Sequence, residues 1–312
     1  MKVVLADRIG FCFGVKRAVN MAEAALKSNK KIYSAPEARN GRAFRRNAQT
    51  YSLGSIIHNK QVVEGLARKG LKVIRDVGAA HGTGAAVVIS SHGISPKVAT
   101  RIRRKGLKVI DTTCPFVLNA QRIARRLANE GYKAVIVGDA NHPEVKALVD
   151  FAPKGAVVVK DRVEAATLKF GKDAKISVLS QTTQSSANFL DVVKAILEKR
   201  PKELKVCNTI CNDAEERQRL ACELASHVGL MLVIGGKHSA NTRRLYEVCR
   251  RALRNTHLVE SSLELKKAWF KSVRSVGIAS GASTPDWVVQ QVVGAITPVR
   301  KHIKIIGKGL CN

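Results

Sequence analysis

Three cysteines share one local pattern that is suited to binding a metal. Cys12, Cys114 and Cys211 lie 102 and 97 residues apart, and each stands between a short apolar run and an amphipathic helical pattern. A predicted helix N-terminus favours the thiolate, the form of cysteine that binds metals. Structural zinc usually takes four ligands in CxxC-like pairs, which are absent, and a 4Fe–4S cluster usually takes four cysteines. An iron–sulfur cluster with one open iron and a set of purely structural thiols are therefore equally open interpretations.

The other four cysteines lie in different settings. Cys222 and Cys249 fall within helical patterns, Cys207 within a predicted strand and Cys311 near the end of the sequence. We interpret them as buried or incidental thiols. Seven cysteines in a chain without a secretion signal argue against a disulfide framework.

Short polar side chains recur in the loops that follow predicted strands. They are His58, His92, His142, Thr182, Thr183, Ser239, Asn241 and Ser283. Such hydrogen-bond donors, close to helix N-termini, suit a compact anion such as a diphosphate. Any one of them alone is better explained as a turn or capping residue, but their threefold placement favours a shared site. No Walker loop, GxGxxG motif or magnesium-binding carboxylate pair occurs, which argues against a standard nucleotide site.

Glu144 and Asp286 are the carboxylates close to these loops. Glu144 follows His142 by two residues and is the natural candidate for a proton donor. The alternative is a first-turn glutamate that interacts with the helix dipole. We interpret Asp286, which follows Pro285, as a capping residue.

An internal repeat explains how these residues are positioned. Three segments run from an apolar stretch through a polar turn and a cysteine into a helix: VVLADRIGFCFGVKRAVNMAEAAL, LKVIDTTCPFVLNAQRIARRLA and LKVCNTICNDAEERQRLACELA. Each is followed by two more strands with polar loops, and open α/β sheets bind ligands at the carboxyl ends of their strands. We predict an α/β protein of three similar small units. Their expected bounds are 13–113, 114–210 and 211–297, with the N-terminal strand 1–12 joined to the third unit and a tail at 298–312.

The spacing also indicates an insertion in the first unit. Cys114 and His142 are 28 residues apart, whereas Cys12 and His58 are 46 residues apart. The surplus of about 18 residues lies at 35–52, a stretch with four arginines and no clear period. We expect a surface loop there, and a basic loop that docks a partner is the alternative.

The net charge of +30 is extreme for a soluble enzyme. It favours anionic partners such as nucleic acid, acidic lipid, acidic protein or phosphorylated substrates, although a generally basic surface with no single cause is equally open. Nucleic-acid binding is not predicted, because no recognised motif or aromatic stacking set supports it. No segment reaches the roughly 18 apolar residues of a membrane span, and the N-terminus lacks the features of a signal peptide. We therefore expect a cytoplasmic protein.

Nine motifs give the chain a specific resemblance to a known family. In order they are GFCFGVKRA, IHNKQVV, SSHGIS, DTTCPFV, GDANHPEV, LSQTTQS, NTIC with RQ following, GGKHSANTRRL and GASTPDW. They extend from residue 10 to about residue 290. The chain resembles the 4-hydroxy-3-methylbut-2-enyl diphosphate reductase family of the non-mevalonate isoprenoid pathway.

The resemblance implies three α/β domains in a cloverleaf around a central 4Fe–4S cluster. It implies that Cys12, Cys114 and Cys211 hold this cluster and that the fourth iron stays open to substrate. It also implies that Glu144, with Thr182, passes protons to the substrate. The residues that it assigns to the substrate are His58, His92, His142, Thr182, Thr183, Ser239, Asn241 and Ser283.

The reaction implied by the resemblance is a reductive dehydroxylation. Two electrons enter through the cluster with two protons, water leaves, and isopentenyl and dimethylallyl diphosphates form. The implied electron donor is an acidic carrier, ferredoxin or flavodoxin, which a basic surface would attract. Three features depart from the family pattern: the insertion at 35–52, the +30 charge, and Ala240 where the family often has a second serine. One diphosphate contact is therefore expected to be lost or to be made by a backbone N–H.

Overall fold

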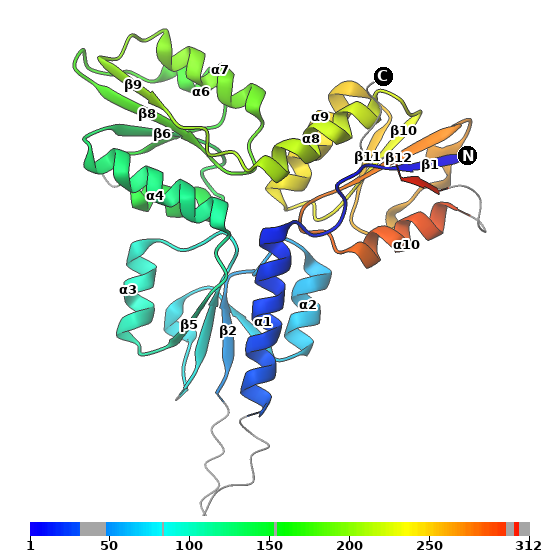
Figure 1. Ribbon diagram of the computed structural model, residues 1–312, viewed down its shortest axis with the longest axis horizontal. Coiled ribbons are helices and arrows are strands. Elements are labelled where there is room, and N and C mark those ends of the chain that lie inside the picture. The colour runs from blue at the N-terminus through cyan, green and yellow to red at the C-terminus, as the bar shows by residue number, and fades with distance from the viewer. Residues whose placement is uncertain (32–47, 83, 153–154, 298–302, 306–312) are drawn as a thin grey trace, which may run out of the picture.

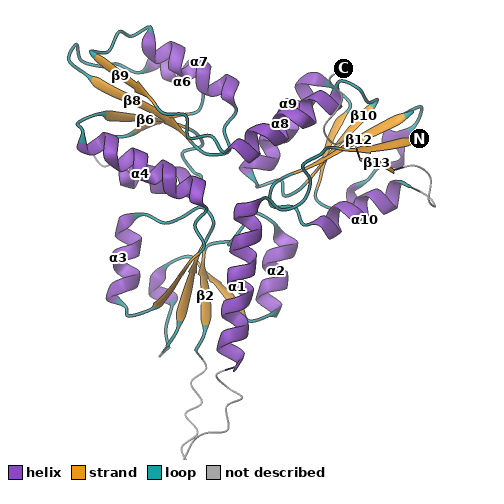
Figure 2. Ribbon diagram, in the orientation of Figure 1, coloured by secondary structure: helices purple, strands orange, loops and turns teal. Residues whose placement is uncertain are grey.

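Three parallel sheets flanked by helices surround a common centre (Figures 1 and 2). The computed structural model describes residues 1–31, 48–82, 84–152, 155–297 and 303–305. The predicted fold class, three similar small α/β units, is confirmed. Among the helices in these ranges, none has the length and apolar character needed to cross a lipid bilayer.

The first unit has the strand order β3-β2-β4-β5. Its strands are β2 (Thr50–Leu53), β3 (Leu71–Ile74), β4 (Ala86–Ile89) and β5 (Lys108–Asp111). Its helices are α1 (Phe13–Lys31), α2 (Lys60–Arg68), the 3₁₀ turn η1 (Val77–Ala79) and α3 (Pro96–Arg104). The run AVVI of β4 is buried throughout, as expected of a central parallel strand. The prediction of a surface loop at 35–52 is wrong for residues 50–52, because they lie in β2 with their side chains buried. Residues 32–47 lie outside the described ranges.

The second unit repeats this plan with the order β7-β6-β8-β9. Its strands are β6 (Lys133–Val137), β7 (Val157–Val159), β8 (Lys175–Ser180) and β9 (Glu203–Val206). Its helices are α4 (Pro115–Asn129), α5 (Pro143–Phe151), α6 (Arg162–Thr167) and α7 (Ser186–Leu197). Pro115 and Pro143 stand at the first helical position, where the missing N–H costs nothing. These prolines fix where the helices begin, directly after the candidate residues Cys114 and His142.

The third unit has the order β11-β10-β12-β1-β13. Its strands are β10 (Leu230–Ile234), β11 (Thr256–Val259), β12 (Ser275–Ser280), β1 (Lys2–Leu5) and β13 (Ile303–Ile305). Its helices are α8 (Asn212–Ala225), α9 (Ala240–Ala252), α10 (Asp286–Ile296) and the 3₁₀ turns η2 (Ser262–Glu264) and η3 (Lys267–Phe270). β1 pairs in parallel with β12, and β13 pairs with β1 within the stretch that the sequence treated as a tail. The unit boundaries proposed from the sequence stay a prediction.

The three sheets place equivalent strand ends at the centre of the molecule. In the third sheet β1 occupies the position that β5 and β9 occupy in the first two, beside the third strand of its unit. Each of these three strands leads to one of the candidate cysteines and then into a helix, and α1, α4 and α8 point their N-termini at the centre (Figure 1). The repeat seen in the sequence is therefore a repeat of position in space.

Candidate functional site

The three cysteines are anchored by one repeated hydrogen bond. The Cys12 N–H donates to the Ala282 carbonyl at 3.0 Å, and the Cys114 N–H donates to the Ser91 carbonyl at 3.0 Å. The Cys211 N–H donates in the same way to the Thr182 carbonyl, at 2.8 Å. Each acceptor lies in the loop after the third strand of the preceding unit, so each cysteine ties the first helix of one unit to its neighbour.

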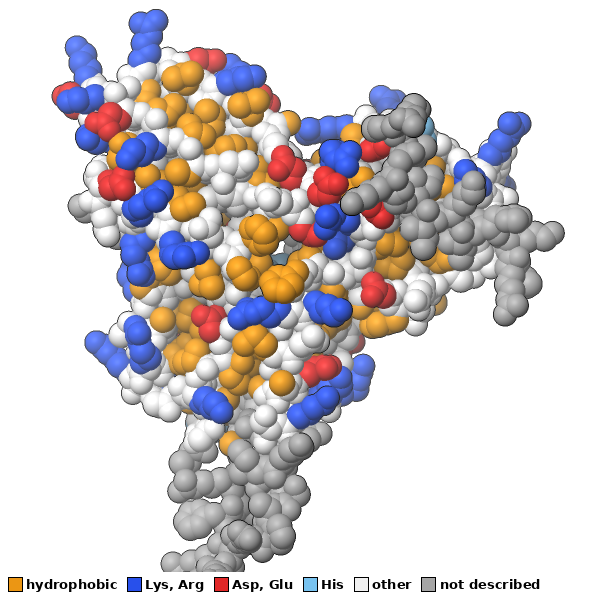
Figure 3. Space-filling view, viewed as in Figure 1, with side chains coloured by type: hydrophobic (Ala, Val, Ile, Leu, Met, Phe, Trp, Pro, Cys, Tyr) orange, Lys and Arg blue, Asp and Glu red, His pale blue; other side chains and the backbone are white. Residues whose placement is uncertain are grey.

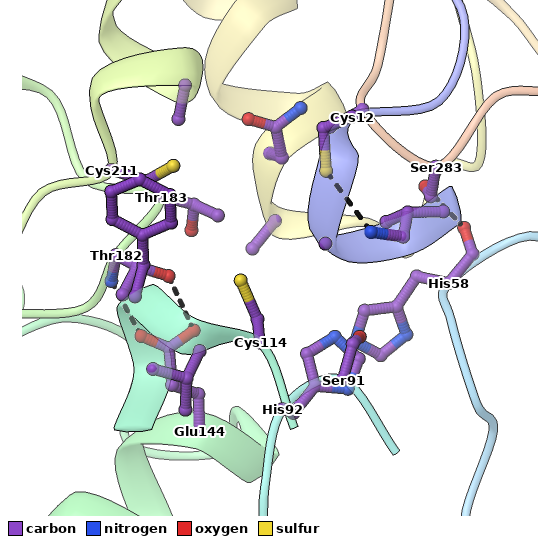
Figure 4. Close-up of a pocket in the computed structure, with 18 of the residues that line it drawn as sticks. Cys12, His58, Ser91, His92, Cys114, Glu144, Thr182, Thr183, Cys211 and Ser283 are labelled. Atoms are coloured by element: carbon purple, nitrogen blue, oxygen red, sulfur yellow. Dashed lines mark hydrogen bonds between the residues drawn. The ribbon is translucent and has the colours of Figure 1, made fainter. Parts of the chain in front are cut away.

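The three thiols face one shared space at the centre (Figure 4). A Cβ built on Gly14 would lie 2.7 Å from Cys114 Sγ and 4.0 Å from Cys12 Sγ, so the sulfurs need a residue without a side chain at this position. The cavity that they line has a volume of about 100 Å³, and no other cysteine of the described residues reaches it. Three thiols in one pocket fit an iron–sulfur cluster, and they lack the fourth protein ligand that a structural zinc site requires.

Burial dominates the acidity of these thiols. It raises the pKa of Cys12, Cys114 and Cys211, that of Cys211 to about 11. Backbone N–H groups at the helix starts lower each pKa, as expected from the sequence, but they do not outweigh burial. The thiols are therefore protonated at neutral pH without a metal, and loading a metal must release protons.

Three histidines from three loops meet beside the thiols. The ring centroids of His58 and His92 are 4.4 Å apart, and the His142 ring lies 5.3 and 5.2 Å from them. Burial lowers the pKa of all three, that of His142 to about 4, and the positive charge of Arg243 adds to the effect at His58 and His142. The rings are therefore neutral at pH 7.

Their nitrogens lie within 4.8 Å of one another, close enough to hold a metal ion, but a hydrogen bond argues against that use. His142 caps α5 by accepting the Glu144 N–H on Nδ1 at 3.2 Å. A neutral ring that accepts on Nδ1 carries its proton on Nε2. His142 thus offers a donor rather than a lone pair, and the cluster of rings suits an anion better than a cation.

Further donors around the histidines support an anion site. His58 Nε2 and Asn241 Nδ2 are buried and have no hydrogen-bond partner among the described residues. Ser239 caps α9 by accepting the Thr242 N–H at 3.3 Å, so a capping role and a place in the site coexist. Ser283 Oγ donates to the His58 carbonyl at 3.2 Å and joins the third unit to the first (Figure 4). Buried donors without partners are costly, so these positions are built for an acceptor that comes from outside.

Glu144 and Thr182 form the acidic part of the site. Glu144 is 1% exposed, and its carboxyl accepts the Thr182 N–H at 2.6 Å and the Thr182 hydroxyl at 2.9 Å (Figure 4). Burial raises the pKa of Glu144 to about 7, although both hydrogen bonds act to lower it. A carboxyl with this pKa exchanges protons readily at neutral pH, as a catalytic acid must.

All twelve residues singled out from the sequence line this one cavity. They are Cys12, His58, His92, Cys114, His142, Glu144, Thr182, Thr183, Cys211, Ser239, Asn241 and Ser283. The lining also includes Gly14, Ser91 and Asp213, which sequence reasoning passed over, and Ala240 at the start of α9. Gly14, Ser91 and Asp213 could have been identified from their positions within or directly beside the quoted motifs.

The remaining cysteines lie away from the cavity. Cys207 follows β9, Cys222 lies in α8 and Cys249 is buried in α9, and all three are free thiols. Cys311 lies outside the described residues.

Comparison with known proteins agrees with this geometry. The model of the LytB protein family matches residues 3–297. Proteins named 4-hydroxy-3-methylbut-2-enyl diphosphate reductase are 43% identical in Geobacter metallireducens and 44% identical in Geotalea uraniireducens. The two alignments cover 96% of this chain and 98% and 99% of those proteins.

Two solved structures are similar over 95% of this chain. One, of (E)-4-hydroxy-3-methyl-but-2-enyl diphosphate reductase, has 39% identity and a TM-score of 0.65 and is covered over 99% of its length. The other, of E-1-hydroxy-2-methyl-but-2-enyl-4-diphosphate reductase from Plasmodium falciparum, has 26% identity and a TM-score of 0.84 and is covered over 88%. Because the family model matches residues 3–297 and the relatives align with 96% of the chain, this chain belongs to the LytB protein family.

Proposed function

We propose that this chain is a 4-hydroxy-3-methylbut-2-enyl diphosphate reductase, an oxidoreductase of the non-mevalonate isoprenoid pathway. The observation that carries the proposal is a single cavity with three thiols, a neutral histidine cluster and a buried carboxyl of raised pKa. These three parts match the needs of the reaction, which are electrons, a site for a diphosphate and a proton.

Cys12, Cys114 and Cys211 hold a 4Fe–4S cluster in this proposal. When bound there, such a cluster would supply electrons one at a time and Lewis acidity. The chain contributes the three sulfurs and the space beside Gly14, and its repeated Cys N–H bonds fix the three helix starts relative to one another.

The histidine cluster binds the diphosphate together with the loop donors of the third unit. Its donors are His58, His92, His142, Ser239, Asn241 and Ser283, and Thr183 also lines the cavity. An anion beside buried neutral imidazoles stabilises their protonated forms, so substrate binding raises the pKa of these rings. The rings that become protonated when the substrate binds then hold its diphosphate by their positive charge.

Glu144 supplies protons to the reacting end of the substrate. Two electrons and two protons added to the allylic alcohol release one water and leave isopentenyl or dimethylallyl diphosphate. With a pKa of about 7, Glu144 is substantially protonated at neutral pH and can give its proton to the departing hydroxyl. The Thr182 hydroxyl, 2.9 Å from the Glu144 carboxyl, orients it and extends its reach.

The electron donor in this proposal is an acidic carrier protein, a ferredoxin or a flavodoxin. The net charge of +30 supports this assignment, because opposite charge accelerates encounter. We place the reaction in the cytoplasm, where thiols stay reduced.

The test is an anaerobic preparation assayed for iron, sulfide and turnover. We expect about four irons and four sulfides per chain, and reduction of the substrate with dithionite and a viologen. A preparation that binds iron and sulfide but does not reduce the substrate would disprove the activity while leaving the cluster assignment intact. Absence of both iron and turnover would disprove the whole proposal.

A further inference from the structure

A second hollow lies between the first two units, and it shares no lining residue with the central cavity. It consists of two adjoining cavities of about 350 and 420 Å³, both lined by Leu118, Gln121 and Phe151. α3 and the edge strand β5 form one wall, and α4 and the end of α5 form the other. We call this hollow the α3–α4 groove.

The floor of the α3–α4 groove is apolar and open to solvent. Val109 of β5 is 42% exposed and Leu118 of α4 is 38% exposed, and the half-buried Ile94 and Phe151 continue the surface. Among the described strands β5 pairs only with β4, so no further strand covers this edge. Figure 3 shows apolar side chains at this junction with Lys and Arg side chains beside them. Contiguous exposed apolar surface of this kind marks a binding site more often than a chance patch.

The rim of the groove carries unpaired positive charge. Arg103, Arg122 and Arg125 line it and make no ion pair with any described residue, whereas Asp111 is the one carboxylate in the lining. The Arg125 guanidinium lies over the Phe151 ring, 4.8 Å from its centroid, which holds it at the apolar floor. The next residue, Arg126, differs because it does not line the groove and pairs with Glu130 at 3.8 Å. The lining therefore has an excess of two positive charges.

A buried amide adds a directional donor. Gln121 is 4% exposed and lines both parts of the groove, and its Nε2 has no hydrogen-bond partner among the described residues. A buried donor of this kind is costly unless a bound group accepts from it. The groove thus offers an apolar floor, two excess positive charges and one unused donor within a single hollow.

We propose that the α3–α4 groove binds an amphiphilic phosphate, a hydrocarbon chain that ends in a phosphate group. The chain lies on Ile94, Val109 and Leu118, and the phosphate is held by the guanidinium groups of Arg122 and Arg125. A phosphate monoester carries nearly two negative charges at neutral pH, which matches the excess of the lining. Guanidinium groups bind phosphate oxygens in pairs, which explains arginine rather than lysine at the rim. Because α4 begins next to Cys114, this ligand contacts a helix that also serves the central site.

Titration calorimetry with decyl phosphate on the purified full chain tests this site without any turnover. Below its micelle concentration, decyl phosphate should bind at a single saturable site, and octyl phosphate should bind about 15-fold more weakly because two methylenes are missing. Inorganic phosphate, which lacks the chain, and decyl maltoside, which lacks the charge, should show no saturable binding. Equal binding of decyl maltoside would overturn the proposal, because the arginines would then have no role.

Matched variants locate the binding. The double substitution Arg122→Gln with Arg125→Gln should weaken decyl phosphate binding at least tenfold, and Leu118→Asp should abolish it by repulsion. Arg126→Gln, on the same helix, should change it less than twofold, and circular dichroism checks that each variant is folded. An equal loss in the Arg126→Gln protein, or competition by inorganic diphosphate, would place the binding outside the groove and overturn the proposal.

Discussion

The central cavity has a thiol side, formed by Cys12, Cys114 and Cys211, and a polar side, formed by the histidines, Glu144 and the loop hydroxyl and amide groups. The threefold repeat is preserved on the first side and not on the second. On the thiol side, each cysteine N–H donates to a carbonyl of the preceding unit at 2.8 to 3.0 Å, so one backbone contact occurs three times. On the polar side, the equivalent loops after the third strands carry His92, Thr182 and Ser283, three different side chains.

The difference separates two requirements. A cluster is nearly symmetric and can be held by a repeated backbone contact. A substrate with a diphosphate at one end and a hydroxyl at the other needs an anion site and an acid in different places. In the proposed function the histidines and the Glu144–Thr182 pair meet that need, because equivalent loops of the repeat carry different side chains although the cysteine backbone contact recurs. Substitutions on the two sides should therefore have separable effects.

Loss of one cysteine should have the largest effect. Cys114→Ala removes one of the three proposed cluster ligands, so we expect iron and sulfide to fall to background and turnover to vanish. Cys249→Ala, at a buried thiol outside the cavity, is the matched control and should keep its iron. The measurement is iron and sulfide per chain with an electron paramagnetic resonance spectrum. Normal iron in the Cys114→Ala protein would mean that the threefold contact is structural only.

Substitution of the acid should separate catalysis from cluster binding. Glu144→Gln keeps the shape and can still accept the Thr182 hydroxyl, but it has no proton to give at neutral pH. Turnover should fall about 10²- to 10⁴-fold while iron content and spectrum stay unchanged. Glu164→Gln changes an exposed first-turn glutamate of α6 and should turn over normally. Unchanged turnover in the Glu144→Gln protein would remove Glu144 from the mechanism.

The sequence was sufficient to find the cavity because its residues sit at strand ends. Parallel strands expose their carboxyl ends at one edge, so the repeat alone placed the cysteines and the polar loops together. His142 and Ser239 are both helix caps and site residues. The hydrogen bonds that cap the helices also hold these two side chains at the cavity.

Properties that depend on packing between units could not be predicted from the sequence. The thiols of Cys12, Cys114 and Cys211 were expected to be acidic at helix starts, yet contacts from other units bury them and raise their pKa. The Glu144 pKa depends in the same way on burial by residues far along the chain. The pairing of residues 303–305 with β1 joins opposite ends of the chain, and no local pattern near residue 303 signals it.

The pH dependence of stability should report the burial of Glu144 directly. Its pKa is raised from 4.5 to about 7 in the folded state, so its contribution to stability is present below pH 4.5 and is lost as the pH rises through 7. Relative to Glu144→Gln, the cluster-free wild-type protein should therefore lose about 2 kcal/mol of unfolding free energy between pH 5 and pH 7.5. Urea unfolding of both proteins at the two pH values measures this difference. A constant difference would show that the carboxyl titrates at its ordinary pKa.

Anion binding on the polar side should take up protons. Because burial lowers the pKa values of His58 and His92, a bound diphosphate should raise them and draw a fraction of a proton from solvent near pH 7. Calorimetry of inorganic diphosphate binding to the cluster-free protein, in buffers of different ionisation enthalpy, measures the uptake. His58→Gln should reduce it, because His58 Nε2 has no partner among the described residues, whereas His227→Gln, at an exposed position in the third unit, should not. Proton release instead of uptake would contradict an anion site.

A charge at the edge of the polar side should have the smallest effect. Arg243 lies close enough to lower the pKa of His58 and His142, and it pairs with Asp139 of the second unit at 3.5 Å. Both partners are nearly half exposed, so the pair itself contributes at most about 1 kcal/mol to stability. Arg243→Gln should nevertheless weaken diphosphate binding roughly two- to fivefold, and the loss should shrink in high salt because water and ions screen the charge.

Arg251, at the far end of the same helix, supplies the control for that measurement. Arg251→Gln removes the same charge from α9 at a greater distance from the histidines, so it should leave diphosphate affinity within experimental error. Equal losses in the two variants would mean that the whole basic surface, rather than the potential at the polar side, attracts the anion. A loss of diphosphate affinity in Arg243→Gln alone would show that the charges around the cavity also differ between its two sides, with positive charge placed to attract the anion at the polar side.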